Sequence, residues 1–497
     1  MSASTSAPAI HQRIDFQSLP VRLESDDDRV ITLPFIAGIP ERLSELVERI
    51  KSLPDEEAES SLDEVRQRFM HRHEKLDLVF LEHFGMAARL TNFHESISAT
   101  KQLLIGSYFT MEYSFQSTAL FNPSIVPHFD QTGVPEGGIR FIMSLRATGE
   151  GHISSTVFRT GVIMPDESIA IDEAPRLSAR TRVAPDHSYH KWIFRRKLAE
   201  MSVHMDEVDR VLERLHDEFT FVELEKAIQD YQEAGADVTT FTEAVNSMLY
   251  LARSNYQVKL SPDADVSHLV LFPHSEDEAH GIEDMRLVRF VDDDASVTYY
   301  GTYTAYNGTN ILPMLIETAD FKRVRVHTLN GACALNKGMA LFPRRINGHY
   351  TMCSRIDGHR LFIMYSDLVH FWESAEPVAE PKYSWELRTI GNCGSPIETD
   401  EGWLLLTHGV GPMRRYSLGA MLLDLENPAK LIGRLRVPLI EPSEDEREGY
   451  VPNVVYACGA MRLGERLYIS YAVADEITRI GSVSLQGLID QIKEDGP

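Results

Sequence analysis

Two neighbouring segments, "VTYYGTYTAY" (Val297–Tyr306) and "ILPMLIETAD" (Ile311–Asp320), are separated by the short turn sequence "NGTN". Both segments are rich in the aromatic and β-branched residues that favour strands, and the Asn-Gly pair between them is a turn signal. This stretch therefore predicts a β-hairpin of two short strands.

Similar hairpins recur along the chain. The first and second strand candidates of the other four are "GIRFIMSLR" with "HISSTVFRTG", "HYTMCSRI" with "RLFIMYSDLV", "WLLLTHGV" with "LGAMLLDLE", and "RLYISYAV" with "TRIGSVSL". A polar residue stands at or just beyond the end of each first strand; these residues are Arg146, Tyr306, Arg355, His408 and Asp475. A β-sandwich also contains many hairpins, but radial repetition would gather these five residues around one mouth. The pattern predicts an all-β, five-bladed β-propeller.

Two segments do not fit this repeat. Residues 1–108 contain "ERLSELVERIKSL" and "DEVRQRFMHRHEKLDLVFLEHF", which have helical spacing and predict an N-terminal arm with helices. Residues 188–255 contain "MDEVDRVLERLHDEF", with Met205, Val208, Leu212 and Leu215 on one face, and predict a helical insertion. The first blade is then expected over residues 109–187 and the remaining blades over 256–490. Such helices either cover the propeller or mediate self-association, and we expect a homo-oligomer.

The composition excludes several classes of partner. The 497 residues include 74 acidic and 49 basic side chains, and the net charge of −25 argues against a nucleic acid. No apolar run approaches the roughly 18 residues of a membrane span. The start, "MSASTSAPAIHQRIDF", lacks the features of a secretory signal, so a cytoplasmic location is expected. The four cysteines show no zinc-finger spacing and are interpreted as reduced thiols.

Candidate chemistry begins at "GIEDMR", which places Glu283, Asp284 and Arg286 directly before an apolar, strand-like run. A carboxylate beside a second carboxylate and an arginine can have its proton affinity shifted either way, as a general acid requires. Lys337, Arg355 and His408 stand at the ends of hairpins or just before them, and together predict an anion site. No metalloprotease motif is present, and "HRH" (His71–His73) lacks a third ligand, so no metal and no cofactor are expected.

The motifs "GIEDMR", "YTAYNG", "NKGMALFPRRINGHY", "GSPIETDEGWLLLTHGV", "EGYVPNVVYACGA" and "ADEITRIGSVSL" resemble, in order, those of glycoside hydrolase family 130. The members of this family are inverting β-mannoside phosphorylases and related β-mannosidases on a five-bladed propeller. The resemblance covers roughly residues 118–170 and 256–488. Met285 stands where the family often has proline, which changes the stiffness of the turn but removes neither carboxylate.

The resemblance implies a role for each matching residue. Asp284 looks like the catalytic acid, which in this family is thought to protonate the glycosidic oxygen through a sugar hydroxyl. The implied phosphate site is Lys337, Arg355, His408 and Tyr416, with Tyr450 as the alternative to Tyr416. The implied mannosyl-binding residues are Asn122, Arg146, Glu283, Arg286, Tyr306 and Asp475.

Phosphate is an anionic nucleophile, so a phosphorylase needs cationic groups rather than the second carboxylate of an inverting hydrolase. The expected function is therefore reversible phosphorolysis of a β-mannoside, with inorganic phosphate as co-substrate. An inverting β-mannosidase of the same fold and a non-catalytic glycan-binding propeller remain as alternatives. The linkage and the acceptor sugar are left open by the sequence.

Overall fold

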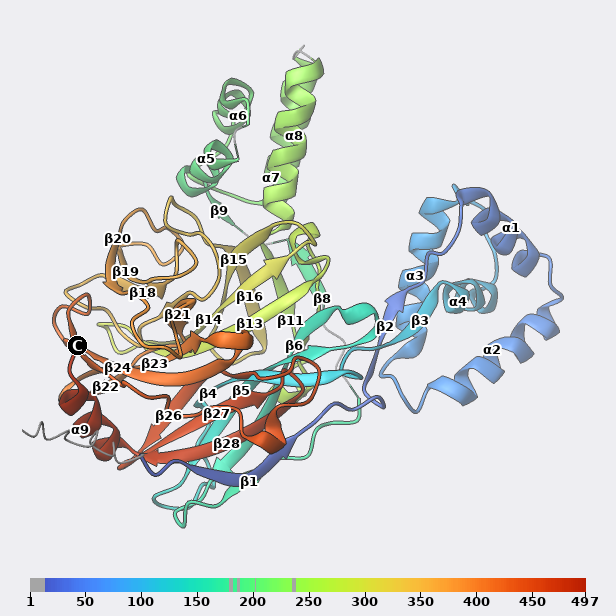
Figure 1. Ribbon diagram of the computed structural model, residues 1–497. Helices are drawn as coiled ribbons and strands as arrows, with labels where there is room; N and C mark the ends of the chain where they lie inside the picture. The colour runs from blue at the N-terminus through green and yellow to red at the C-terminus, as the bar shows by residue number, and fades with distance from the viewer. Residues whose placement is uncertain (1–13, 178–181, 186–187, 202, 235–237) are drawn as a thin grey trace, which may run out of the picture.

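The computed structural model describes residues 14–177, 182–185, 188–201, 203–234 and 238–497 (Figure 1). The chain is largely β, with several separate sheets gathered into one body. One group of helices lies to the side of this body, and a second group projects from it (Figure 1). None of the helices in the described residues combines the length and apolar character needed to cross a membrane.

All five predicted hairpins are confirmed as antiparallel strand pairs. They are β5 (Ile139–Thr148) with β6 (Ser154–Ile163), β14 (Val297–Tyr306) with β15 (Ile311–Thr318), β18 (Tyr350–Ser354) with β19 (Leu361–Ser366), β23 (Gly402–Val410) with β24 (Tyr416–Leu423), and β27 (Arg466–Val473) with β28 (Ile477–Ser484). The first strands of three of these hairpins, β14, β23 and β27, are almost wholly buried on both faces, as expected for sheets packed against one another.

The first two hairpins belong to one sheet of eleven strands, in which the main order is β4-β5-β6-β13-β14-β15-β16-β11-β8. Its other strands are β4 (Ala119–Pro127), β7 (Ile169–Ile171), β8 (Arg182–Pro185), β11 (Tyr256–Lys259), β12 (Val270–Leu271), β13 (Gly281–Val291) and β16 (Arg323–Thr328). Strands β6 and β13 meet through the parallel pairing of Ser154 with Gly281.

The other three hairpins each form a sheet with further strands. These strands are β17 (Ala340–Leu341) and β20 (Ala375–Ala379) beside β18 and β19; β21 (Thr389–Asn392), β22 (Ile397–Thr399) and β25 (Leu431–Arg434) beside β23 and β24; and β1 (Gln17–Leu23) and β26 (Val455–Leu463) beside β27 and β28. β1 pairs with β28, so a segment near the start of the chain completes the last sheet.

The N-terminal helices are α1 (Pro40–Lys51), α2 (Asp55–Phe69), α3 (Leu76–Leu90) and α4 (Ala99–Tyr108), between β2 (Val30–Pro34) and β3 (Thr110–Ser114). The apolar positions Leu43, Val47 and Ile50 of α1 are buried in the core that these helices share. The charged stretch with helical spacing is divided between α2 and α3, and the break ends at Lys75, which has a positive φ of 51°.

The second helical group is α5 (Lys191–Glu200), α6 (Met205–Leu212), α7 (Phe221–Glu233) and α8 (Val238–Arg253), with β9 (Tyr189–His190) pairing with β10 (Glu218–Phe219). Val208, Leu212 and Leu215 lie in a hydrophobic core that this helical group forms by itself. A capping box of Thr220 and Glu223 starts α7. The chain leaves the large sheet at β8 and returns at β11, and these two strands pair with each other. The expected boundary at residue 187 lies outside the described residues. A last helix, α9 (Leu485–Asp495), follows β28.

Candidate active site

Glu283 and Asp284 lie within strand β13, at a β-bulge. The sequence suggested that they precede the strand, but pairing with β14 already begins at Gly281. The register shifts between Glu283, which pairs with Thr304, and Arg286, which pairs with Thr302. Asp284 takes up the irregularity with a φ of 53°, a conformation that non-glycine residues seldom adopt. The bulge turns its side chain away from the regular alternation of the strand.

Strand β4 has the same irregularity. Its register with β5 shifts between Phe121 and Ser124, and Asn122 between them has a φ of 49°. The two bulges bring together side chains that are 162 positions apart, because the Asn122 Nδ2 donates a hydrogen bond of 2.8 Å to the Asp284 Oδ1. A third shift occurs in β26, between Tyr456 and Gly459.

The first part of the site, here called the carboxylate side, consists of Asn122, Arg146, Glu283, Asp284 and Lys337. Arg146 on β5 bridges both carboxylates, with its Nη1 3.3 Å from the Asp284 Oδ1 and its Nη2 3.1 Å from the Glu283 Oε1. The Lys337 Nζ contacts the other oxygen of Glu283 at 2.5 Å. The carboxylate side chains keep 13 and 19% of their surface exposed, so water and small solutes can reach them.

These neighbours fix the charge of Asp284. Burial by itself favours the neutral acid, but the positive charges of Arg146 and Arg286 and the hydrogen bond from Asn122 outweigh it. They hold the pKa of this carboxyl below its ordinary value, so Asp284 is ionised at neutral pH in the ligand-free protein.

Asp475 behaves in the opposite way. It follows β27 with a φ of 51°, and burial together with the negative charge of Asp284 raises its pKa to about 7. Arg146 and Arg414 oppose this increase without cancelling it. Near neutral pH, the proton of this pair of acids therefore resides on Asp475.

The second part of the site, here called the anion side, consists of Arg286, Arg355, His408 and Tyr456. The Arg355 Nη1 lies 3.1 Å from the His408 Nε2. The His408 ring packs edge-on to Tyr456 at 4.9 Å, and the Tyr456 hydroxyl accepts a hydrogen bond of 2.7 Å from the Arg286 Nη2. The Arg286 Nη1 donates to the backbone carbonyl of Asp284 at 2.9 Å, which joins the two sides.

His408 does not contribute the positive charge that the sequence suggested. It is buried in β23, and burial together with the charges of Arg355 and Arg286 lowers its pKa well below the usual value. A neutral His408 presents its Nε2 lone pair to Arg355 and so orients the guanidinium. Gly391 leaves room for this contact, because a Cβ there would lie 2.6 Å from the His408 Cε1.

The remaining expected residues are placed as follows. Tyr306 lies below Lys337, whose Nζ is 5.8 Å from the centre of its ring. The Tyr416 ring is nearly parallel to the His408 ring, with 6.1 Å between ring centres. Tyr450, the alternative to Tyr416, instead contacts His152 through its hydroxyl and is 42% exposed.

The structure therefore brings the sequence-derived candidates into one network, and Lys337 joins it through Glu283 rather than through Arg355. Sequence reasoning missed Tyr456, although its motif was noted, because a tyrosine within an apolar segment gives no signal before the β26 bulge is known. Several buried polar atoms in this network have no hydrogen-bond partner among the described residues. They are the Asn122 Oδ1 and the Arg146, Arg286 and Arg355 Nε atoms. Buried polar atoms of this kind are usually satisfied by water or by a polar ligand.

Comparison with known proteins gives a consistent result. The family profile described as beta-1,4-mannooligosaccharide phosphorylase matches residues 242–494. A 1,2-beta-oligomannan phosphorylase of Thermoanaerobacter sp. (strain X514) is 34% identical over 223 residues, which cover 44% of this chain and 73% of that protein. A beta-1,2-mannobiose phosphorylase of the same strain is 37% identical over 216 residues, and this alignment covers 43% of this chain and 69% of that protein.

Among solved structures, the beta-1,2-mannobiose phosphorylase of Listeria innocua in complex with beta-1,2-mannobiose aligns with 76% of this chain and 92% of its own. That alignment has 21% identity and a TM-score of 0.45. The profile match spans half of the chain and includes the acidic bulge of β13 and the Arg355–His408 pair. The chain belongs to glycoside hydrolase family 130.

Proposed function

We propose that the protein is an inverting β-mannoside phosphorylase, which transfers a mannosyl group from a β-mannoside to inorganic phosphate. The names of its relatives support this class of reaction, and β-1,2-linked oligomannosides are the first substrates to test because the relatives described above act on them. In this reaction the bond between the mannosyl C1 and the acceptor oxygen breaks. A bond from C1 to a phosphate oxygen forms on the opposite face, giving α-D-mannose 1-phosphate.

We further propose that the sheets form the five blades of a propeller. The eleven-stranded sheet divides naturally where β6 and β13 meet through one parallel pair of residues. The two parts, together with the three smaller sheets, then give one blade for each confirmed hairpin. Pairing of β1 with β28 would close the last blade.

The observation that carries the phosphorylase assignment is the state of Arg355. Its guanidinium is hydrogen-bonded to a neutral histidine, its Nε is buried without a partner, and among the described residues no carboxylate forms an ion pair with it. In a protein with a net charge of −25, such a cation is suited to an anion from solution. A phosphate held there would need no carboxylate to activate it.

The proton for the departing acceptor oxygen is assigned to Asp284, acting through a hydroxyl of the bound sugar. Asp284 is ionised in the free protein, so it must gain a proton when substrates bind. A phosphate anion at Arg355 would add negative charge close to Arg286 and Asp284, which favours protonation of the acid. Asp475 would supply a nearby reserve of protons near neutral pH. The side chains of Asn122, Arg146, Glu283 and Tyr306 would then hold the mannosyl ring.

The decisive experiment incubates the protein with β-1,2- and β-1,4-mannobiose, with and without phosphate, and measures mannose 1-phosphate and free mannose. Phosphorolysis requires phosphate and yields mannose 1-phosphate. Free mannose released at an equal rate without phosphate would instead support the β-mannosidase alternative. Mannoside binding without either product would support the non-catalytic alternative. The homo-oligomeric state and cytoplasmic location expected from the sequence stay predictions.

A further inference from the structure

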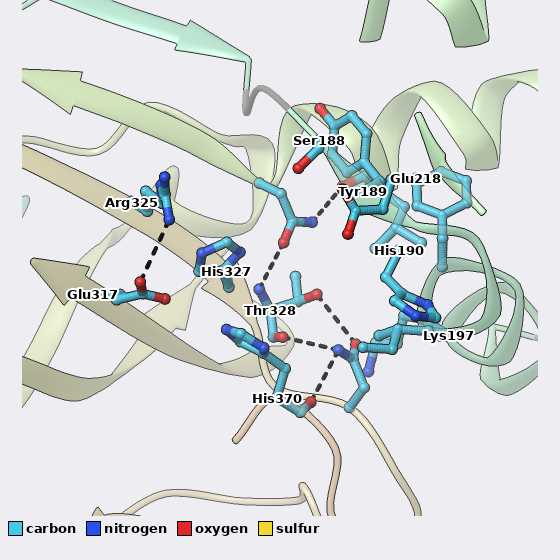
Figure 2. Close-up of a pocket in the computed structure, with 15 residues that line it drawn as sticks. Ser188, Tyr189, His190, Lys197, Glu218, Glu317, Arg325, His327, Thr328 and His370 are labelled. Carbon is cyan, nitrogen blue, oxygen red and sulfur yellow. Dashed lines mark hydrogen bonds and ion pairs between the residues drawn. The ribbon is translucent and has the colours of Figure 1, made fainter. Parts of the chain in front are cut away.

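A second cluster of polar side chains lies away from the candidate active site, where the α5–α8 group meets the large sheet. Figure 2 shows His327 and His370 facing one another, with Glu317 beside them. Nitrogen and oxygen atoms of the three side chains that could bind a metal all lie within 4.8 Å of one another. The two imidazole rings are 4.5 Å apart, centre to centre, and tilted by 58°.

The fold fixes all three residues. Glu317 is on β15 and His327 on β16, and because Glu317 pairs with Arg325, the two side chains are diagonal neighbours on one face of the sheet. His370 comes from the segment after β19. Its backbone carbonyl accepts hydrogen bonds from the backbone N–H of Asn330, at 2.9 Å, and from the Asn330 Nδ2, at 3.1 Å. The cluster thus joins the large sheet to the neighbouring β17–β20 sheet.

Two of the three side chains are imidazoles, and the imidazole nitrogen is the commonest metal ligand in proteins. The Nε2 of His370 is buried and has no hydrogen-bond partner among the described residues.

The surroundings favour a cation that prefers nitrogen ligands. The cluster borders a cavity of about 250 Å³, into which Lys197 and Arg325 bring positive charge and Glu218 and Glu317 negative charge. Arg325 is also paired with Glu317, with 3.4 Å between the Nη1 and Oε1 atoms. Because these charges balance, affinity would rest on the two imidazoles, which suit zinc far better than calcium or magnesium.

We propose that Glu317, His327 and His370 bind a zinc ion that clamps the two sheets together. Two histidines and one carboxylate are a known zinc ligand set, and bonds of about 2.1 Å would place the ligand atoms roughly 3.4 Å apart. Side-chain rotations that move the ligand atoms by about an ångström would bring them to this separation. The sequence suggested no metal, because these residues are 10 and 43 positions apart and share no motif.

The site lies apart from the candidate active site and does not depend on the proposed function. Ile311 pairs with Tyr306 near the candidate active site, and Glu317 lies six residues further along β15, roughly 20 Å away at the usual rise of a strand. Its occupancy is therefore expected to change stability and to leave turnover unchanged.

The test uses the full-length protein, freed of metal with a chelator and titrated with Zn²⁺ by calorimetry. We expect one zinc per chain and a rise in melting temperature of several degrees. Glu317→Gln and His370→Gln should each weaken zinc affinity about tenfold or more, and should abolish the thermal shift. Both variants must melt like the wild type in chelator, which separates loss of the site from loss of the fold.

The matched control is His268→Gln. His268 is another partly buried histidine with a ring nitrogen, Nδ1, that lacks a partner among the described residues, but it lies outside the cluster. The His268→Gln variant should bind zinc with the affinity of the wild type. Absence of zinc binding by the wild type, or equal affinity in all three variants, would overturn the proposal.

Discussion

The carboxylate side and the anion side of the candidate site are held in different ways. On the carboxylate side, Glu283 and Asp284 are matched by Arg146 and Lys337, and two bulged strands fix their positions. On the anion side, Arg355 follows β18 and His408 lies on β23, which pairs with β21 and β24 without a shift of register. Arg355 has a neutral histidine as its partner. The carboxylate side therefore has its charges paired within the free protein, whereas Arg355 on the anion side has no carboxylate partner among the described residues.

Asp284→Asn is expected to have the largest effect, because it removes the proton donor while keeping its shape and the hydrogen bond to Asn122. Turnover should fall by about 10² to 10⁴. Phosphorolysis of β-1,2-mannobiose measures the loss, and Asp293→Asn, an exposed residue just beyond β13, is the control. Normal turnover by a folded Asp284→Asn variant would show that Asp284 is not the catalytic acid.

Arg355→Ala tests the anion side. Loss of a charge-assisted contact of about 1.5–3 kcal/mol should raise the KM for phosphate about ten- to a hundredfold. Mannoside binding measured without phosphate should change much less. Arg360→Ala, on the same hairpin but paired with Asp357, is the matched control. If Arg355→Ala instead loses mannoside binding and keeps its phosphate affinity, the two sides have been assigned the wrong ligands.

Gly391→Ala sharpens the comparison without removing a charge. The added methyl group would press on the His408 ring and lie 3.3 Å from the Arg355 Nη1, so the pair must shift. Overpacking of this kind costs about 1–3 kcal/mol, and phosphate affinity should fall about five- to twentyfold. Gly487→Ala in α9, where the new methyl group would meet Ser484 at an ordinary 3.5 Å, should behave like the wild type. An unchanged phosphate KM would show that the geometry of His408 does not control Arg355.

The smallest expected effect is a pH-dependent change in stability at Asp475. Its folded pKa of about 7 lies above the ordinary carboxyl value, so the folded state binds the proton more tightly than the unfolded state. This stabilisation is complete below about pH 4 and is lost as the pH rises through 7. Thermal melts of the wild type should therefore lose a few degrees over this range relative to Asp475→Asn. Parallel pH profiles of the two proteins would contradict the raised pKa of Asp475 in the folded state.

The sequence predicted the hairpins well because alternation and turn residues are local signals. It also indicated Asp284, Arg146 and Arg355 as candidate site residues, since charged residues beside apolar strands are conspicuous. It could not reveal the bulges that aim Asn122 and Asp284 at each other, because a shift of register depends on the partner strand. The neutral state of His408 and the grouping of Glu317 with two distant histidines depend on burial in the folded chain, which no short motif records.

The pairing of β1 with β28 has a consequence for the synthesis of the protein. Gln17 aligns with Ser482, so the first strand emerges from the ribosome 465 residues before its partner. At about 5–20 residues per second, this strand waits roughly 25–90 s with an unpaired edge. The last sheet can form only when translation is nearly complete, and during that interval a chaperone has access to an edge that the finished protein conceals.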